Sequence, residues 1–223
     1  MGLSMLLSCN FSNTNPNEQI PKKETKEPSK YAYNINIDSL HVLTETVRNG
    51  ESVGQILSTH NISFAHIDKV ARLSKKVFDL RNVKAGGHYA LLFSDSTLNN
   101  PYYFIYEIDK VDFLVAELYD TINVYLDKKD VIIKEKTGSG IISSSLWYAM
   151  EESGLSAKLV NILADEIYPW TIDFFRLNNG DKFKVIYDAK YVDGEFIGVG
   201  KVHAALFQNN GNDYYAIAFN EVG

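Results

Sequence analysis

The sequence predicts an α+β protein in which two small domains follow a polar N-terminal segment. The 223 residues suffice for one large or two small domains, and 13% of them are aromatic, mainly Tyr and Phe. Helix-like and strand-like patterns occupy separate runs, which is typical of the α+β class. The net charge of -6 argues against a nucleic-acid partner, because phosphate binding needs a basic face. No apolar run reaches the roughly 20 residues of a membrane-spanning helix.

Residues 1–9, MGLSMLLSC, end in the single cysteine of the chain. Leu6, Leu7 and Ser8 before Cys9 resemble the lipobox of bacterial lipoproteins, which implies that Cys9 carries a lipid. The segment is shorter than a secretory signal and has no Lys or Arg, so an incidental cysteine is the alternative. Residues 10–35 are rich in Asn, Pro, Lys and Glu, and this composition predicts a disordered tether. The chain would then contact a membrane only through the lipid.

The first domain is expected over residues 36–115. HVLTETVRNGESVGQIL predicts a strand, an Asn49–Gly50 turn and a helix capped by Ser52. Residues 63–78 predict a second helix, whose basic face is either solvated or meets an anionic polymer. HYALLF predicts the closing strand. The inward positions predicted for the two helices are Val53, Ile56, Leu57 and His60, then Phe64, Ile67, Val70, Ala71 and Val77.

This strand–helix–helix–strand order, with the phrase VRNGESVGQIL, resembles the LysM fold. The resemblance implies a module that recognises N-acetylglucosamine polymers. The Asn-rich loop usual between the second LysM helix and the last strand is absent here, and no glycan-binding residue is assigned.

The second domain is expected over residues 116–223, with strands, then a helical region over 139–170, then strands again. Gly154 is predicted to end one helix, Ser156 to cap the next and Pro169 to stop it. Leu159, Ile162, Leu163 and Ile167 would form the buried stripe of that second helix.

The stretch EIYPWTIDFFRLNNGDKFKVIYD, residues 166–188, combines aromatic and acidic residues. If it is a packed junction between the helices and the last strands, Trp170 is buried. The alternative is a hydrolase, in which two of the carboxylates Asp165, Glu166 and Asp173 would cleave a glycosidic bond. No histidine and no glycine-rich loop accompanies these acids, which favours the packed junction.

Five phrases in order carry a more specific resemblance: GSGIISSSLWYAMEESGL, ILADEIYPWTIDF, NNGDKFKVIY, VDGEFIGVGKVHAALF and DYYAIAF. Together they cover residues 138–219 and resemble the region that precedes the catalytic domain of LytM/lysostaphin-type zinc peptidases. These bacterial enzymes cut the peptide cross-links of peptidoglycan. The LysM-like part extends the resemblance back to about residue 40.

The metal site of that family consists of an H-x-x-x-D pair and an H-x-H pair, since zinc hydrolysis needs three ligands and an open position for water. Neither pair occurs around the five histidines, which are His41, His60, His66, His88 and His203. The resemblance therefore implies zinc only in a catalytic domain beyond residue 223, with no catalytic residue and no cofactor in this chain. His203, on an apolar strand, is expected to be a hydrogen-bonded core residue.

The favoured interpretation is a non-catalytic accessory region on the periplasmic side of the bacterial envelope. Its expected partners are peptidoglycan and a LytM-type catalytic domain, which it would position or restrain. One alternative is a stand-alone peptidoglycan-binding lipoprotein, for which Trp147 and Tyr148 would supply an exposed aromatic strip. The other is the carboxylate-dependent hydrolase.

Overall fold

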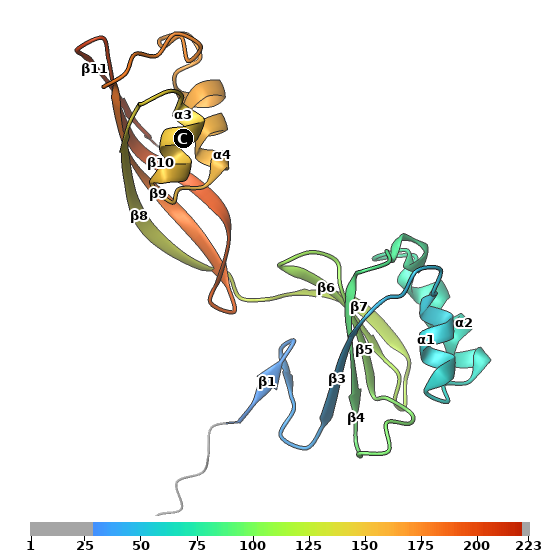
Figure 1. Ribbon diagram of the computed structural model, residues 1–223. Helices are drawn as coiled ribbons and strands as arrows, with labels where there is room; N and C mark the ends of the chain where they lie inside the picture. Colours follow the sequence, from blue (N-terminus) through green and yellow to red (C-terminus); the bar gives the residue numbers. More distant parts are fainter. Residues whose placement is uncertain (1–28, 220–223) are drawn as a thin grey trace, which may run out of the picture.

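The computed structural model describes residues 29–219, which form two α+β lobes joined by a short connection (Figure 1). The α+β class predicted from the sequence is confirmed. The first lobe contains a five-stranded sheet of order β3-β4-β5-β6-β7, and the second a four-stranded sheet of order β11-β10-β9-β8. Every pair of neighbouring strands is antiparallel.

The elements of the first lobe are β1 (Tyr31–Ala32), β2 (Ile35–Asn36), β3 (His41–Thr46), α1 (Val53–Thr59), α2 (Phe64–Ser74), η1 (Leu80–Asn82), β4 (His88–Phe93), β5 (Tyr103–Glu107), β6 (Asp112–Glu117) and β7 (Asn123–Lys128). Those of the second lobe are β8 (Ile132–Ile141), α3 (Leu146–Glu152), α4 (Ala157–Asn161), η2 (Ile162–Ile167), β9 (Lys182–Val192), β10 (Glu195–Asn209) and β11 (Asn212–Ile217).

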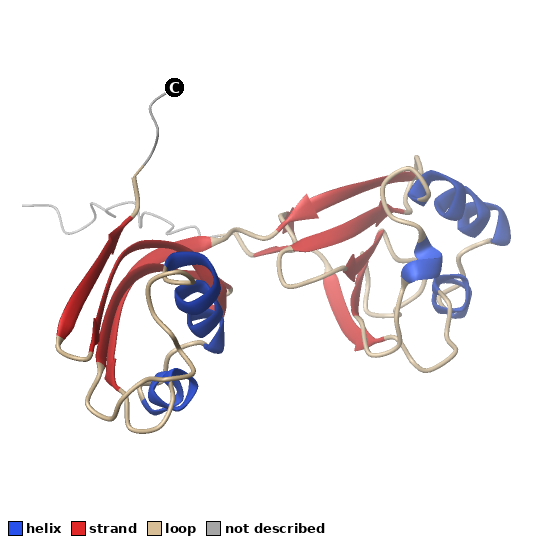
Figure 2. Cartoon of the chain, turned by 90° about the horizontal axis from the view of Figure 1, so that it is seen from above, coloured by secondary structure: helices blue, strands red, loops and turns tan. Residues whose placement is uncertain are grey.

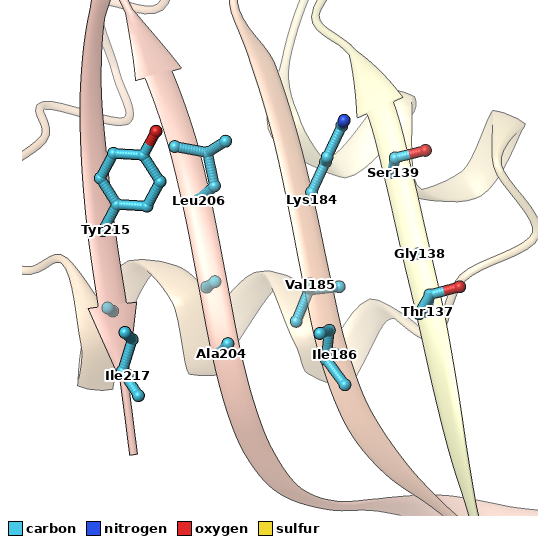
Figure 3. Close-up of a pocket in the computed structure, with 12 residues that line it drawn as sticks. Thr137, Gly138, Ser139, Lys184, Val185, Ile186, Ala204, Leu206, Tyr215 and Ile217 are labelled. Atoms are coloured by element: carbon cyan, nitrogen blue, oxygen red, sulfur yellow. The ribbon is translucent and has the colours of Figure 1, made fainter. Parts of the chain in front are cut away.

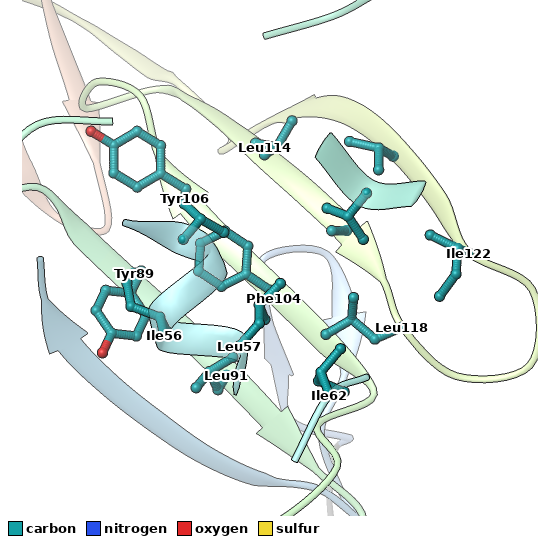
Figure 4. Packing of buried hydrophobic residues seen from close by; sticks show 14 of the residues in the cluster. Ile56, Leu57, Ile62, Tyr89, Leu91, Phe104, Tyr106, Leu114, Leu118 and Ile122 are labelled. Atoms are coloured by element: carbon teal, nitrogen blue, oxygen red, sulfur yellow. The ribbon is translucent and has the colours of Figure 1, made fainter. Parts of the chain in front are cut away.

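The first sheet is buried on both faces. On one face, α1 and α2 pack against side chains such as Leu91, Phe104 and Leu114 (Figure 4). On the other, the segment containing the β1–β2 hairpin packs on a second cluster that includes Leu92 and Phe113. Strands covered on both faces have near-continuous apolar runs, which explains why HYALLF and FLVA do not alternate.

The start of α1 has the predicted cap. Ser52 accepts a hydrogen bond from the backbone N–H of Gln55, and the Gln55 side chain accepts one from the Ser52 N–H, which completes a capping box. Val53, Ile56 and Leu57 are buried as predicted.

Three predictions for the first lobe were wrong. Phe64 and Val77 are exposed instead of facing inward, because α2 begins at Phe64 and ends at Ser74, which leaves both residues at the margins of the contact with the sheet. Residues 31–35 belong to a folded hairpin and not to the tether, because Tyr33 and Ile35 pack on the sheet. The boundary between 115 and 116 falls inside β6, which pairs with β7; the first sheet ends at Lys128.

The second sheet is covered by helices on one face, as the view in Figure 2 shows. The predicted helix end and cap are present: Gly154 has a positive φ of 66°, and Ser156 accepts from the N–H of Lys158. Residues 139–141, expected to be helical, extend β8. These residues pair with β9, and Gly138 and Gly140 allow close packing there, because a Cβ on Gly140 would lie 2.6 Å from the Phe183 ring and one on Gly138 2.7 Å from Leu155.

Residues 129–131 connect the two sheets, and Lys129 makes contacts in both lobes. Its ammonium lies 2.9 Å from a carboxylate oxygen of Glu107 in the first lobe and 3.4 Å from Asp193 in the β9–β10 turn of the second. Tyr33 donates a hydrogen bond to the same Glu107 oxygen, at 2.9 Å. Burial opposes the charge on Lys129, but the hydrogen bond to Glu107 raises its pKa overall. The connection is therefore held by a charged network.

Candidate functional site: the open face of the second sheet

The second sheet has one face without helices, and this open face is apolar at its centre (Figure 3). β9 alternates in burial from Lys182 onward, so that Phe183, Val185 and Tyr187 point to the helices and the residues between them to the open side. A shallow hollow of about 450 Å³ runs across all four strands on the open side.

The registers place the open-face residues in two neighbouring rows. One row runs Ser139, Lys184, Leu206 and Tyr215, and the other runs Thr137, Ile186, Ala204 and Ile217. Tyr215 and Ile217 on the edge strand β11 are 70% and 75% exposed. Directly opposed side chains in a sheet lie about 5 Å apart, so each row forms a continuous surface.

The end of this face bears the His203–Asp188 pair. His203 Nε2 lies 2.7 Å from Asp188 Oδ1. The predicted hydrogen bond of His203 is thus present, but the side chain is partly exposed and not in the core. In the range 29–219, no three His, Cys, Asp or Glu side chains are grouped so that they could hold a metal ion.

Asp165 and Asp173 line an open hollow of about 650 Å³ beside Trp170, and Glu166 does not line it. Asp165 and Glu166, on η2, and Asp173 in the following loop are all exposed. Asp173 accepts a hydrogen bond from the backbone N–H of Phe175 at 3.0 Å and lies 3.6 Å from the Arg176 guanidinium. Glycoside cleavage by two carboxyls takes place in a site that shields at least one of them from water, and all three carboxyls here are exposed. Their arrangement is that of surface and turn residues.

The packed junction exists, but Trp170 lies outside it. Tyr168 and Ile172 are buried, Phe174 contacts the ring of Phe207 edge-on with centroids 5.4 Å apart, and Trp170 is 97% exposed. The Tyr168 hydroxyl donates to the carbonyl oxygen of residue 214 at 3.0 Å, and burial raises the pKa of Tyr168 to about 12. The prediction that Trp170 is a core residue was wrong: the chain turns after Pro169, and this turn directs Trp170 to solvent.

Trp147 and Tyr148 are both about half exposed, on α3. Consecutive residues of an α-helix point about 100° apart, so the two rings do not form one flat strip. Cys9 lies outside the described residues. No helix within residues 29–219 is long and apolar enough to cross a bilayer.

Comparison with known proteins gives a family match for the second lobe and a curated relative for part of the chain. Residues 132–222 match the family described as the second domain of Csd3. A stretch of 98 residues is 38% identical to the peptidoglycan DD-endopeptidase ShyC of Vibrio cholerae. This chain resembles the N-terminal accessory region of LytM-type peptidases.

Two solved structures extend the likeness of the fold to both lobes. A zinc-containing peptidase from Vibrio cholerae superposes on 78% of this chain with a TM-score of 0.55 and 18% identity, and Helicobacter pylori Csd3 on 79% with a TM-score of 0.53 and 15% identity. The match to ShyC spans 44% of this chain and only 22% of ShyC, and the two structural matches span 54% and 48% of those chains. This chain thus spans about half or less of the length of each of these relatives.

The open face was not predicted, although the sequence contains its signal. KFKVIYD alternates charged or apolar outward positions with buried ones, and YYAI places Tyr215 and Ile217 on the same side. The alternation shows that β9 has two different faces. Only the three-dimensional arrangement shows that no helix covers the outward one, on which Tyr215 and Ile217 are exposed (Figure 2).

Proposed function

We propose that this chain is a non-catalytic accessory region that positions or restrains a LytM-type catalytic domain during peptidoglycan cleavage. The region acts on the periplasmic side of the bacterial envelope and contacts peptidoglycan. Support comes from the match of residues 132–222 to the Csd3 second domain and from the open apolar face that this same segment builds.

The open face is the surface proposed to receive the catalytic domain. Its apolar residues include Ile186 and Leu206 on the inner strands and Ile217 on the edge strand, and such exposed apolar surface is typical of sites that bind another protein. Lys184 lies within it on β9, and Lys182 lies two residues before Lys184 on the same strand. A complementary partner surface is apolar with carboxylates at its margin, since paired charges set the orientation of docking.

The first prediction tests this surface. The chain is expected to bind a purified LytM-type catalytic domain, and Ile217→Lys is expected to weaken that binding at least tenfold, because a charge would be buried without a partner. Titration calorimetry measures the dissociation constant. The chain by itself is expected to release no muropeptides from purified sacculi, with or without added zinc.

Phe64→Lys is the matched control, since Phe64 is 83% exposed and lies in the first lobe. It should leave the affinity unchanged. Equal losses for both variants, or no binding by the parent chain, would contradict docking at the open face. Chelator-sensitive release of muropeptides by the chain alone would contradict the non-catalytic role.

Cys9 is proposed as the lipid attachment site, on the basis of Leu6, Leu7 and Ser8 before it. In a bacterial host that expresses the gene, Cys9→Ala is expected to move the protein from the membrane fraction to the soluble fraction. A single acyl chain binds membranes only marginally, whereas several acyl chains anchor stably, so the change should be nearly complete. Fractionation with immunoblotting measures it, and equal partitioning of the two proteins would refute the assignment.

A further inference from the structure

The outer side of α2 is basic, and neither the packing of the first lobe nor the open face of the second sheet uses it. Residues 63–78 carry four Lys or Arg side chains and one Asp, so their net charge is +3. The whole chain has a net charge of -6, which leaves -9 for the rest of it. A positively charged helix thus lies in an otherwise acidic chain.

The helix turns these charges away from the core. Ile67, Val70 and Leu73 pack toward the first sheet. Residues 69, 72 and 75 follow at steps of three, which keeps them on one side of a helix, and residue 76 comes directly after them. The four cations are exposed and together are called the basic face: Lys69, Arg72, Lys75 and Lys76.

One salt bridge neutralises part of the basic face. The Arg72 guanidinium lies 2.9 Å from a carboxylate oxygen of Asp68, and both side chains are mostly exposed. Within residues 29–219, Lys69 and Lys76 form no salt bridge. Because exposed ion pairs are weak, Arg72 can exchange Asp68 for another anion at little cost. The positive potential of this face is therefore available to a partner.

An exposed aromatic ring lies beside the basic face. Phe64 is the first residue of α2 and is 83% exposed. It precedes Arg72 by about two turns and Lys75 by about three, so it points to the same side of the helix. Val77, just beyond the other end, is also exposed. Aromatic rings beside cations suit the boundary between lipid headgroups and acyl chains, where the ring enters the boundary and the long cationic side chains reach the phosphates.

This combination distinguishes a bilayer from a dissolved polyanion. A polyanion in solution attracts Lys and Arg but offers no apolar surface to Phe64. The lobe that carries the basic face is also the one into which the N-terminal segment leads, since the described chain enters it through β1. The choice of a bilayer over an acidic protein therefore rests on the lipid proposed at Cys9, which would hold this lobe close to a membrane.

We propose that the basic face and Phe64 bind the surface of a bilayer that contains anionic phospholipids. The four cations contact headgroup phosphates, and the Phe64 ring enters the boundary with the acyl chains. α2 lies parallel to the bilayer, because Phe64 and Lys75 are at its opposite ends and both reach the surface. This contact adds to the lipid, which the sequence predicted as the only link to a membrane, and it fixes which side of the first lobe faces the bilayer.

The test is co-sedimentation of the Cys9→Ala chain with phospholipid vesicles, since this chain carries no acyl group at residue 9. Vesicles of phosphatidylethanolamine with about one quarter phosphatidylglycerol are expected to bind it, and vesicles of phosphatidylcholine to bind it at least tenfold more weakly, because the cations need an anionic surface. Raising sodium chloride from about 50 mM to about 500 mM should weaken the binding at least tenfold, since the salt screens these charges.

Two variants separate the contributions of charge and ring. Lys69→Glu combined with Lys76→Glu is expected to weaken binding to the anionic vesicles at least tenfold, because two attractive charges become repulsive. Phe64→Ser is expected to weaken vesicle binding at least threefold and to leave binding of soluble polyphosphate unchanged, because only the bilayer receives the ring. All three side chains are exposed, so urea unfolding of these variants should match the parent.

The matched control is Lys136→Glu combined with Lys158→Glu, which changes the net charge equally at exposed lysines of the second lobe. It should stay within about twofold of the parent. The proposal is overturned by no binding to the anionic vesicles at millimolar lipid, by equal losses from the two lysine pairs, or by unchanged vesicle binding of Phe64→Ser, which would assign the basic face to a dissolved polyanion. Binding of the catalytic domain by Lys69→Glu with Lys76→Glu is measured in parallel and should equal that of the parent, so that failure of the membrane contact and failure of the docking surface are distinguished.

Discussion

Replacing Phe207 by Ala is expected to lower the free energy of unfolding of the second lobe by about 3–5 kcal/mol, the range for removal of a large core aromatic. Phe207 is fully buried on β10 and meets the rings of Tyr168 and Phe174 edge-on, with centroids 6.2 and 5.4 Å away. Its removal would leave a cavity where the junction loop packs on the sheet. A domain of ordinary stability has only about 5–15 kcal/mol, so the variant should be close to unfolding at 37 °C.

Urea unfolding followed by tryptophan fluorescence measures this effect selectively, because the two tryptophans of the chain, Trp147 and Trp170, both lie in the second lobe. Trp170→Ala is the control. At 97% exposure, its substitution should change stability by no more than about 0.5 kcal/mol. A larger loss from Trp170→Ala than from Phe207→Ala would show that the junction is packed differently.

Asp181→Ala is expected to cost the second lobe about 2–4 kcal/mol, since each buried donor left without an acceptor costs about 1–3 kcal/mol. Asp181 is the only charged residue buried among residues 29–219. Its carboxylate accepts from the N–H of Asn178 at 2.8 Å, the N–H of Asn210 at 2.9 Å and the amide of Asn209 at 2.7 Å. It thus joins the turn before β9 to the β10–β11 turn.

The same carboxylate predicts a pH dependence. Burial alone would raise the pKa of Asp181, but the hydrogen bonds from Asn178, Asn210 and Asn209 hold it below its usual value. A pKa that is lower in the folded state than in the unfolded state stabilises the fold above the unfolded value, near pH 4, and this contribution is lost as the pH falls through the folded pKa. The unfolding free energy of the parent should therefore fall in acid.

Asp181→Asn is the matched variant, because it keeps the size of the side chain and one acceptor oxygen but cannot ionise. Urea unfolding between pH 2 and pH 7 should show a flatter acid limb for this variant than for the parent. An identical slope in the two proteins would mean that Asp181 does not contribute to the acid dependence.

Local patterns in the sequence predicted most of the elements. Ser52 and Ser156 act as caps and Gly154 ends its helix because these effects depend on neighbouring backbone groups within a few residues. The predicted strands of the second lobe are present because alternation with period two is a property of the strand itself. The likeness to the accessory region of LytM-type peptidases also came from ordered phrases in the sequence, and the comparisons support it.

What only the tertiary structure decided was which surfaces are covered. An aromatic residue in a loop can face either way, so the sequence could not show that Ile172 is buried while Trp170 is exposed. The domain boundary was misplaced because the pairing of β6 with β7 is a contact between strands and leaves no mark on their periodicity. Tyr102 and Tyr119 are 17 positions apart and become a stacked pair only through the antiparallel turn between β5 and β6. Periodicity determines which residues of a strand share a face, but whether that face meets a helix, a hairpin or solvent depends on segments distant in the sequence.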